Sequence, residues 1–487
     1  MAPNAKADKQ FGNPGAALLV SRWLRTLDTR VSRAEAIEPT RPATGANDPA
    51  HPAERVTAAV PPATDVTDPV PPSADIPDRV PATAELIGAA CPALDWAASG
   101  CMDLTGPADG PPVLSPAAMY GLLREVIRAL ADSTADTGEP VDLDPATALS
   151  GRAALTGLRR AGRRSAGGTS RLLRTADGWC AITLSRSDDL DAVPAILGER
   201  CDVAPWEALV AAAKHWSATQ LADRAQLLGV PAAALPHTPG PAVPWQATRI
   251  SAPTAGRTLR DCLVIDLSSM WAGPLCAHVL GRAGARIVKV ESPHRPDGAR
   301  ADPAFFDRLH AGHEFRTVDF RSGTGRTELA ALIDAADIVI EASRPRALAQ
   351  LGLGPDSRPH HAGQIWLSLT GYGRDDPMRV AFGDDAAVAG GLVGRYEDEP
   401  VFCADAVADP LSGICAALAV VGAVRAGGGL LLDLSMRDTA AAFATAPPLA
   451  HGPHHVVRTN SGWVVECEHL GRAQPVLAPA AVAGALC

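Results

Sequence analysis

Residues 262–291 read CLVIDLSSMWAGPLCAHVLGRAGARIVKVE, and this stretch decides the expected fold. It begins with a short apolar run, CLVIDL, which has the length and composition of a buried parallel strand. A turn, SSMWAGP, leads into a predicted helix from Pro274 to Leu280, and glycines follow where that helix should end. RIVKVE, at 286–291, is the next predicted strand. A strand, a helix and a second strand in this order predict a parallel βαβ unit.

The same alternation continues along the chain. The next predicted elements are a helix in GRTELAALIDAA, a strand in DIVIEA, a helix in PRALAQLG and a strand in QIWLSLTG. Strands that alternate with helices pair in parallel through right-handed crossovers. We therefore predict an α/β protein in which residues 258–446 form a doubly wound, Rossmann-like parallel sheet domain.

The remaining chain divides by composition. With 487 residues the protein is long enough for two or three domains. Residues 1–83 are expected to hold an N-terminal helix and a linker rich in proline and alanine, which lacks the large side chains of a packed core. Residues 84–250 are expected to form a smaller α+β domain, because the hairpin pattern RLLRTADGWCAITL lies among helical stretches. Residues 447–487 are expected to be a C-terminal tail.

Composition also limits the partners. A net charge of −10 without a basic cluster argues against nucleic acid. The ten cysteines show no CxxC pair or zinc-like spacing, so we expect buried thiols and no metal site, and we interpret His451, His454 and His455 as part of a loop. No stretch approaches the roughly 18–20 apolar residues of a membrane span, which predicts a cytoplasmic protein without membrane contact.

Ligands of doubly wound sheets bind at the carboxyl ends of the strands. The loops expected there are 268–274, 292–300, 342–346 and 370–376, and three of the four contain arginine. This pattern favours a phosphorylated ligand. The dinucleotide fingerprint GxGxxG is absent after the first strand, which disfavours an NAD-dependent dehydrogenase.

One acid stands at the start of a long apolar run, AVADPLSGICAALAV, at 406–420. Asp409 precedes Pro410, and an aspartate followed by proline is an ordinary helix cap and first turn. From these residues alone, capping is the favoured role of Asp409.

A resemblance changes that interpretation. The runs VIDLSSMWAGPLCAHVLGRAGARIVKVESP, FRTVDFRSGTGRTELAALIDAADIVIEASRPRALAQLGL, SLTGYG, GDDAAVAGGL and ADPLSGICAALA follow one another from Leu259 to about Met436. In order and spacing they resemble the family III CoA-transferases, which include formyl-CoA and carnitine CoA-transferases and 2-methylacyl-CoA racemases. The resemblance implies that this domain binds coenzyme A.

The resemblance also implies site residues. Asp409 lies in the family's D-x-x-x-G element and is the implied nucleophile, which a helix N-terminus would keep ionised. The positions that match the family's CoA contacts are Met270, Trp271, Ser292, Val318 to Arg321, Ala342, Ser343, Arg344, Gln350, Phe382, Asp384 and Asp385. Four of these positions, Ser292, Ala342, Ser343 and Gln350, carry residues that differ from those usual in the family.

The N-terminal half resembles the later part of the same family, but it lacks the nucleophile. Its corresponding segment, LSPAAMYGLLREVIRAL, offers Ser115 or Ala117 opposite Asp409. The chain thus resembles two incomplete copies in a fused or permuted order, whose halves complete each other. The loop RRSAGGTS, at 163–170, is expected to contribute to the acyl specificity.

The implied activity is the transfer of CoA from an acyl-CoA to a carboxylic acid through an aspartyl anhydride and an aspartyl thioester. The CoA thioester is then a substrate, and no tightly bound cofactor is needed. Two alternatives stay open. One is a racemase or epimerase, although Asp384 stands where the racemases have a histidine; the other is a CoA-binding paralogue without turnover. The family's interlocked dimers imply either a homodimer or a monomer paired internally.

Overall fold

The computed structural model describes residues 13–29, 91–200, 202–238, 240, 242–448 and 452–479. All of them belong to one compact unit. The predicted proline-rich linker lies outside the described residues, and so does His451.

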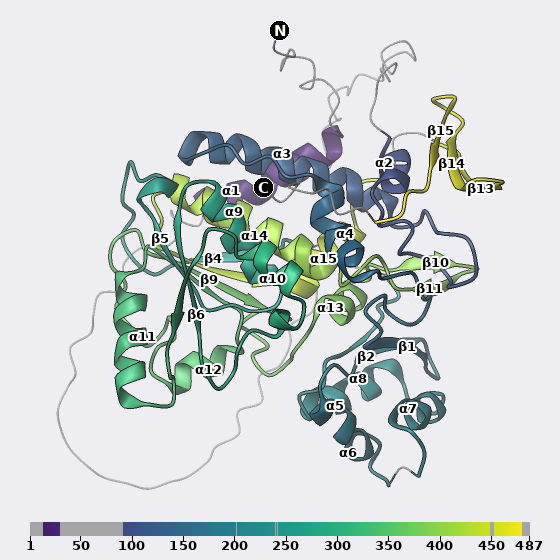
Figure 1. The fold of residues 1–487 in the computed structure, drawn as a ribbon, viewed down its shortest axis with the longest axis horizontal. Coiled ribbons are helices and arrows are strands. Elements are labelled where there is room, and N and C mark those ends of the chain that lie inside the picture. The colour runs from purple at the N-terminus through teal and green to yellow at the C-terminus, as the bar shows by residue number, and fades with distance from the viewer. Residues whose placement is uncertain are drawn as a thin grey trace, which may run out of the picture. The chain divides into compact units, whose positions relative to one another are not determined.

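The largest sheet has seven strands in the order β4-β12-β9-β8-β5-β6-β7 (Figure 1). Its neighbouring strands are parallel, except that β4 runs antiparallel to β12 at one edge. This mixed α/β fold confirms the coarse prediction, whereas the Rossmann-like double winding stays a prediction. The strands are β4 (Trp245–Arg249), β5 (Leu263–Asp266), β6 (Arg286–Glu291), β7 (Glu314–Thr317), β8 (Ile338–Glu341), β9 (Ile365–Thr370) and β12 (Leu430–Ser435).

Helices cover both faces of this sheet (Figure 1). Successive residues of a strand point to opposite faces, and in β5 Val264 packs in one core cluster while Ile265 packs in another. The larger cluster includes α9 (Ala272–Arg282), α14 (Ala408–Arg425), α3 (Ala117–Thr137), α15 (Met436–Ala444) and α1 (Pro14–Thr29). The other cluster includes α11 (Gly323–Ala335) and α12 (Pro345–Gln350). Because both faces are covered, the strands read as continuous apolar runs rather than as an alternation.

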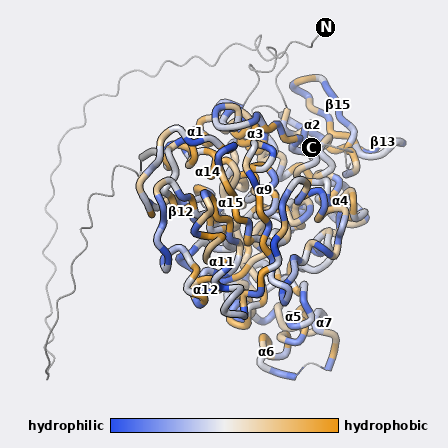
Figure 2. Tube along the Cα trace, turned by 60° about the vertical axis from the view of Figure 1, so that its left-hand side comes forward, coloured by the Kyte–Doolittle hydropathy of each residue, from blue (hydrophilic) through white to orange (hydrophobic). Residues whose placement is uncertain are grey.

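The central helix of the larger cluster is α14, which is hydrophobic along most of its length (Figure 2). By length and composition α14 could span a membrane, so the expectation that no such stretch exists is wrong. However, 83% of it is buried inside the protein, in contact with α9, α3 and α15. A helix that is apolar all round and covered by neighbours is a core helix.

Close approach of α14 to α9 depends on Gly413. A Cβ atom at this position would lie 2.6 Å from the carbonyl oxygen of Ala272 and 3.0 Å from Cβ of Leu275. Gly413→Ala should therefore lower the free energy of unfolding by about 1–3 kcal/mol, because the two helices must move apart. Denaturant unfolding checks this against Gly323→Ala in α11, where nothing lies within 4 Å of the added atom. The control should be neutral or slightly stabilising, and equal midpoints for the two variants would contradict the packing argument.

A second region of the fold contains a small antiparallel sheet of order β1-β2-β3. The predicted hairpin is confirmed, since β1 and β2 pair around the turn at Asp177 and Gly178. Helices from this region pack on the sheet in a separate core cluster. The elements are β1 (Ser170–Arg174), β2 (Trp179–Thr183), α5 (Ser187–Asp191), α6 (Val193–Leu197), α7 (Pro205–Ala213), α8 (Ala218–Leu227) and β3 (Ala232–Ala234).

The other elements lie outside these two regions. A three-stranded sheet near the C-terminus, of order β13-β14-β15, contacts α2. It consists of β13 (His454–Thr459), β14 (Gly462–Cys467) and β15 (Arg472–Pro475), and it lies in the segment expected to be a tail. The remaining elements are α2 (Pro92–Ala98), α4 (Pro145–Thr156), the short helices η2 (Leu259–Asp261) and η3 (Gly298–Ala301), α10 (Pro303–Leu309), α13 (Gly383–Ala389), β10 (Gly394–Tyr396) and β11 (Glu399–Val401).

Candidate active site

Two helix starts meet at Asp409. Asp409 lies in the first turn of α14, and its Oδ2 accepts a hydrogen bond from the backbone N–H of Gly383, the first residue of α13, at 3.1 Å. In return, Oδ1 of Asp384 accepts a hydrogen bond from the backbone N–H of Ala406 at 3.1 Å. A backbone N–H at or just before the start of each helix therefore donates a hydrogen bond to a carboxylate of the other helix.

The backbone between the two helix starts leaves no room for a side chain at Gly383. A Cβ atom there would overlap the carbonyl oxygen of Ala406 and Oδ2 of Asp409. The segment just before α14 is also strained, since Ala404 and Ala406 have φ values of 53° and 43°. Strained residues of this kind persist where the surrounding structure fixes them, and they concentrate at functional sites.

Asp409 does not act as a helix cap. It is the second residue of α14, and its side chain is bonded to α13 rather than to the N–H groups of its own helix. Within the described part of the chain, no hydrogen bond to its Oδ1 is found. The capping role favoured by the local sequence is therefore wrong.

Asp409 is the most accessible of four neighbouring aspartates. Asp384, Asp385 and Asp405 are 8%, 0% and 1% exposed, whereas Asp409 is only half-buried. A carboxylate with one unbonded oxygen and partial access can reach a substrate, whereas its buried neighbours are held by the protein.

The N-terminal half supplies the partners of the three buried acids. Arg152 of α4 donates to both carboxylate oxygens of Asp405, each at 2.9 Å. Ser170 Oγ donates to Asp384 at 3.1 Å, and Thr183 Oγ1 donates to Asp385 at 2.9 Å. Arg152 and Thr183 were not identified from the sequence, because nothing in a single sequence marks residues more than 200 positions apart as partners. Ser170 is the last residue of the loop 163–170, which was expected to contribute to the acyl specificity.

Burial weakens the acidity of this cluster. Burial raises the pKa of Asp409 to about 7, although attraction to Arg152 opposes the shift. Burial likewise raises the pKa of Asp384 to about 6 and that of Asp385 to about 8. The helix N-terminus was expected to keep Asp409 ionised, and burial acts against that expectation by raising the pKa.

Arg152 links this cluster to the loop after β5. Its guanidinium carbon lies 5.3 Å from the ring centre of Trp271, a distance suited to a cation–π contact. Trp271 is buried at the start of α9, and the preceding Met270 is 40% exposed with a φ of 74°. Of the residues predicted to contact CoA, Trp271 thus reaches the Asp409 cluster through Arg152, and Phe382, Asp384 and Asp385 reach it directly.

The other predicted contacts lie after the carboxyl ends of the parallel strands. Within the described residues, no hydrogen bond or ion pair joins them to Asp409. Arg344 is half-buried and faces other arginines: burial, followed by the charges of Arg346, Arg186 and Arg295, lowers its pKa. Clustered cations of this kind attract an anionic group. The contacts beyond the cluster are Met270 after β5, Ser292 after β6, Arg321 before α11, Ala342, Ser343 and Arg344 after β8, and Gln350 at the end of α12.

A buried lysine holds the loop that carries Met270. Lys289 of β6 lies 3.0 Å from Asp297 and 3.7 Å from Asp266, and all three side chains are fully buried. Lys289 also donates to the carbonyl oxygen of Ser268, while Asp297 accepts from the backbone N–H of Met270 at 2.9 Å. Burial opposes ionisation of Asp297, but Lys289 and backbone N–H groups outweigh it and hold its pKa below the usual value. Ion pairs and hydrogen bonds therefore both connect the ends of β5 and β6 to the loop that carries Met270.

Comparison with known proteins supports the resemblance found in the sequence. Residues 259–475 match the model of CoA-transferase family III. The match runs beyond Met436, where the resemblance was expected to end, and includes β13 to β15.

Several curated proteins are similar to part of the chain. An acyl-CoA transferase of Fusarium pseudograminearum is 30% identical over 255 residues, which cover 47% of this chain and 54% of the relative. The succinate–glutarate CoA-transferase of Agrobacterium fabrum is 27% identical, covering 42% and 61%. The human alpha-methylacyl-CoA racemase is 30% identical, covering 37% and 48%. The chain thus spans about half the length of the curated relatives that it matches.

Solved structures are similar over a comparable part. The crystal structure of Rv3272 from Mycobacterium tuberculosis is 27% identical, with a TM-score of 0.38, and the similarity covers 45% of this chain and 64% of that one.

Proposed function

We propose that the protein transfers CoA from an acyl-CoA to a carboxylic acid, with Asp409 as the nucleophile. The observation that carries the proposal is the state of Asp409 itself. It lies in the segment that matches the family model, it keeps partial access, and only one of its oxygens is bonded to the protein.

The proposed reaction uses the two oxygens of Asp409 differently. Oδ1 attacks the thioester carbonyl of the acyl-CoA, the carbon–sulfur bond breaks, and the products are an acyl–aspartyl anhydride and the CoA thiolate. The thiolate then attacks Cγ of Asp409, the bond from Cγ to Oδ1 breaks, and the first carboxylate leaves with Oδ1. An acceptor carboxylate repeats these steps in reverse on the aspartyl thioester, which yields the new acyl-CoA and restores the carboxylate.

Gly383 is placed to assist each attack on Cγ. Oδ2 remains the carbonyl oxygen of both the anhydride and the thioester, and it already accepts the N–H of Gly383 at 3.1 Å. Negative charge gathers on this oxygen when Cγ is attacked. A backbone donor fixed at that point stabilises the charge, as in an oxyanion hole.

Arg152 is proposed as a positioning residue. It is bound to Asp405, and its charge opposes the upward shift of the Asp409 pKa. Arg152 therefore favours the ionised form of Asp409, which is the form that attacks. Its contact with Trp271 also connects the acid cluster to the loop after β5, where CoA is expected to bind.

The phosphates of CoA are proposed to bind near Arg344. Arg344 follows β8, and the repulsion it experiences from Arg186 and Arg295 would be relieved by phosphate. Arg186 comes from the N-terminal half and donates to the carbonyl oxygen of Gly229 at 3.1 Å. Residues of both halves thus contribute to the proposed phosphate-binding region as well as to the acid cluster. This supports a monomer whose halves complete each other. A mass measured in solution by light scattering tests this: one chain is expected, and an obligate dimer would overturn it.

The pH dependence of the first half-reaction follows from the Asp409 pKa of about 7. The attacking form is the carboxylate, so the rate should rise about tenfold per pH unit below 7 and level off above it. The stability of the fold changes in the opposite direction and falls as the pH rises from about 4 to 7. The reason is that the pKa of Asp409 in the fold is higher than that of an unfolded aspartate, so ionisation costs folding free energy. Measuring kcat/KM for an acyl-CoA from pH 5 to 9 checks this. A rate constant that does not change between pH 5 and 7 would contradict it.

Transfer itself is tested with an isotopically labelled carboxylic acid and a panel of acyl-CoAs. Appearance of label in a new acyl-CoA supports the proposal. Exchange of the α-proton in deuterated water without label transfer would instead identify a racemase. Binding of CoA thioesters without either reaction across the panel would identify a paralogue that has lost turnover.

A further inference from the structure

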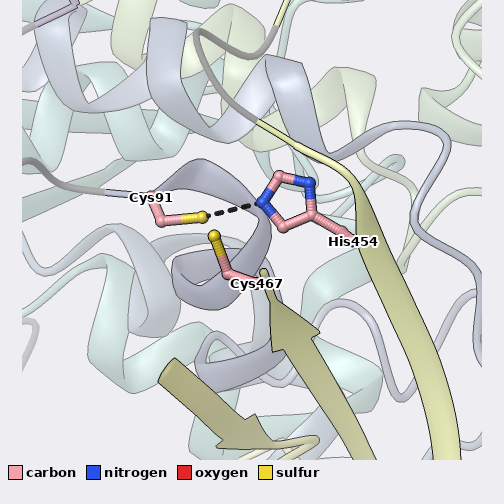
Figure 3. Close-up of side chains that lie close together, drawn as sticks. All are labelled: Cys91, His454 and Cys467. Atoms are coloured by element: carbon pink, nitrogen blue, oxygen red, sulfur yellow. Dashed lines mark hydrogen bonds between the residues drawn. The ribbon is translucent and has the colours of Figure 1, made fainter. Parts of the chain in front are cut away.

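Three potential metal ligands outside the Asp409 cluster lie close together (Figure 3). Cys91 immediately precedes α2, His454 begins β13 and Cys467 ends β14. Their ligand atoms all lie within 4.8 Å of one another, and Sγ of Cys91 is 3.1 Å from Nε2 of His454. The side chains point toward a common centre in Figure 3, although Cys91 and His454 are separated by 363 positions in the sequence.

The fold explains why the three groups share a face. His454 and Cys467 are directly opposite each other in the antiparallel pair β13–β14. Opposite residues of such a pair project to the same side of the sheet. Contacts of α2 with β14 and β15 bring Cys91 to that side, together with a hydrogen bond from the N–H of Leu477, two residues after β15, to the carbonyl oxygen of Ala97 at 2.9 Å.

The small sheet contributes few fully buried side chains to the main core cluster. Of the residues in β13, β14 and β15, only Val465 and Cys467 are fully buried. Small units with so little buried apolar surface commonly depend on a metal or a disulfide for their stability. A ligand shared by the sheet and α2 would supply what packing does not.

We propose that Cys91, His454 and Cys467 bind a zinc ion that fastens the C-terminal sheet to α2. Thiolate sulfur and imidazole nitrogen are the donors that zinc prefers. Zinc–ligand bonds of about 2.0–2.3 Å in a tetrahedron put donors about 3.5–3.8 Å apart, so shifts of about 1 Å suffice. Binding exchanges the two thiol protons for one Zn²⁺, which leaves the site neutral and allows burial of both sulfurs. His454 is only half-buried, so the fourth position is open to water on its side.

This proposal departs from the expectation of no metal site, and from the interpretation of His454 as part of a loop. The sequence shows no zinc pattern because the two strands and the helix bring the ligands together only in the folded chain. It is independent of the proposed CoA transfer, since none of the three residues belongs to the acid cluster.

The test measures zinc in the purified full-length protein. After incubation with excess zinc under reducing conditions and gel filtration, we expect about one zinc ion per chain. Cys91→Ser and Cys467→Ser should each retain at least tenfold less. Cys262→Ser is the matched control, because Cys262 is also a buried thiol but donates to the carbonyl oxygen of Thr258, and it should retain zinc like the wild type.

A measurement on the wild type covers variants that fail to fold. Cobalt substituted for zinc should give the sulfur-to-cobalt charge-transfer band and the intense visible bands of a tetrahedral site. Zinc should protect Cys91 and Cys467, but not Cys262, from alkylation in unfolding conditions mild enough to expose all three. Zinc content below about a tenth of an equivalent, unchanged zinc in Cys91→Ser, or a Cys91–Cys467 disulfide in the protein as purified would each overturn the proposal.

Discussion

Asp409→Asn should lower the rate of CoA transfer by about 10⁴-fold or more, with little change in the fold. An amide of the same shape cannot form an anhydride with the acyl group, and removing a covalent nucleophile typically costs this much. The carbonyl oxygen of asparagine can still accept the N–H of Gly383, so the junction of α13 and α14 should be preserved. The rate of label transfer from a carboxylic acid into acyl-CoA measures the effect.

The matched control for this substitution is Asp438→Asn. Asp438 also lies in the first turn of a helix, α15, but it pairs with Arg437 at the surface. Its replacement should leave transfer within about twofold of the wild type, since exposed ion pairs contribute little. Transfer by Asp409→Asn above about 1% of the wild-type rate would remove Asp409 from the mechanism.

Lys289→Met should lower the free energy of unfolding by about 3–5 kcal/mol. Lys289 compensates two fully buried carboxylates, Asp266 and Asp297, and methionine keeps the volume while removing the charge. Asp297 then loses the partner that holds its pKa below the usual value. Because protonation relieves the unpaired charge, the difference from the wild type should shrink as the pH falls below about 5. Equilibrium unfolding in denaturant at pH 7 and pH 4 measures both effects.

Two comparisons keep this prediction specific. Lys214→Met, at an exposed lysine after α7, should change stability by less than about 0.5 kcal/mol. Adding Asp297→Asn to Lys289→Met should recover part of the loss, because one buried charge is removed with its partner. A loss below about 1 kcal/mol in Lys289→Met, or no recovery in the double variant, would contradict a charge-based role for this network.

Strands β5, β6, β8 and β9 were predictable because each of them is a local signal in the sequence. The runs at 262–267 and 286–291 are short, apolar and followed by turn residues, and they form β5 and β6 within a residue or two. Buried parallel strands carry this signal whatever their neighbours are. Strand β4 was not identified, because WQATR alternates in a segment rich in proline and reads as a boundary.

The site was only partly predictable. Asp409 was found through a resemblance, but its bond to Gly383 depends on how α13 and α14 meet, and the sequence alone favours a cap. Arg152 bonds an acid 253 positions away, and Cys91 lies beside a histidine 363 positions away. Pairings over such separations are set by tertiary packing, and a single sequence carries no mark of them.

The role of Asp409 as nucleophile is tested most directly by trapping the covalent intermediate on its side chain. The protein is incubated with an acyl-CoA and hydroxylamine, which converts an aspartyl thioester or anhydride into a stable hydroxamate, and its peptides are then mapped by mass spectrometry. The account predicts the hydroxamate at Asp409, its absence without acyl-CoA, and its absence in Asp409→Asn. Label transfer that proceeds while Asp409 stays unmodified, or a hydroxamate formed at Asp384, Asp385 or Asp405 instead, would contradict it.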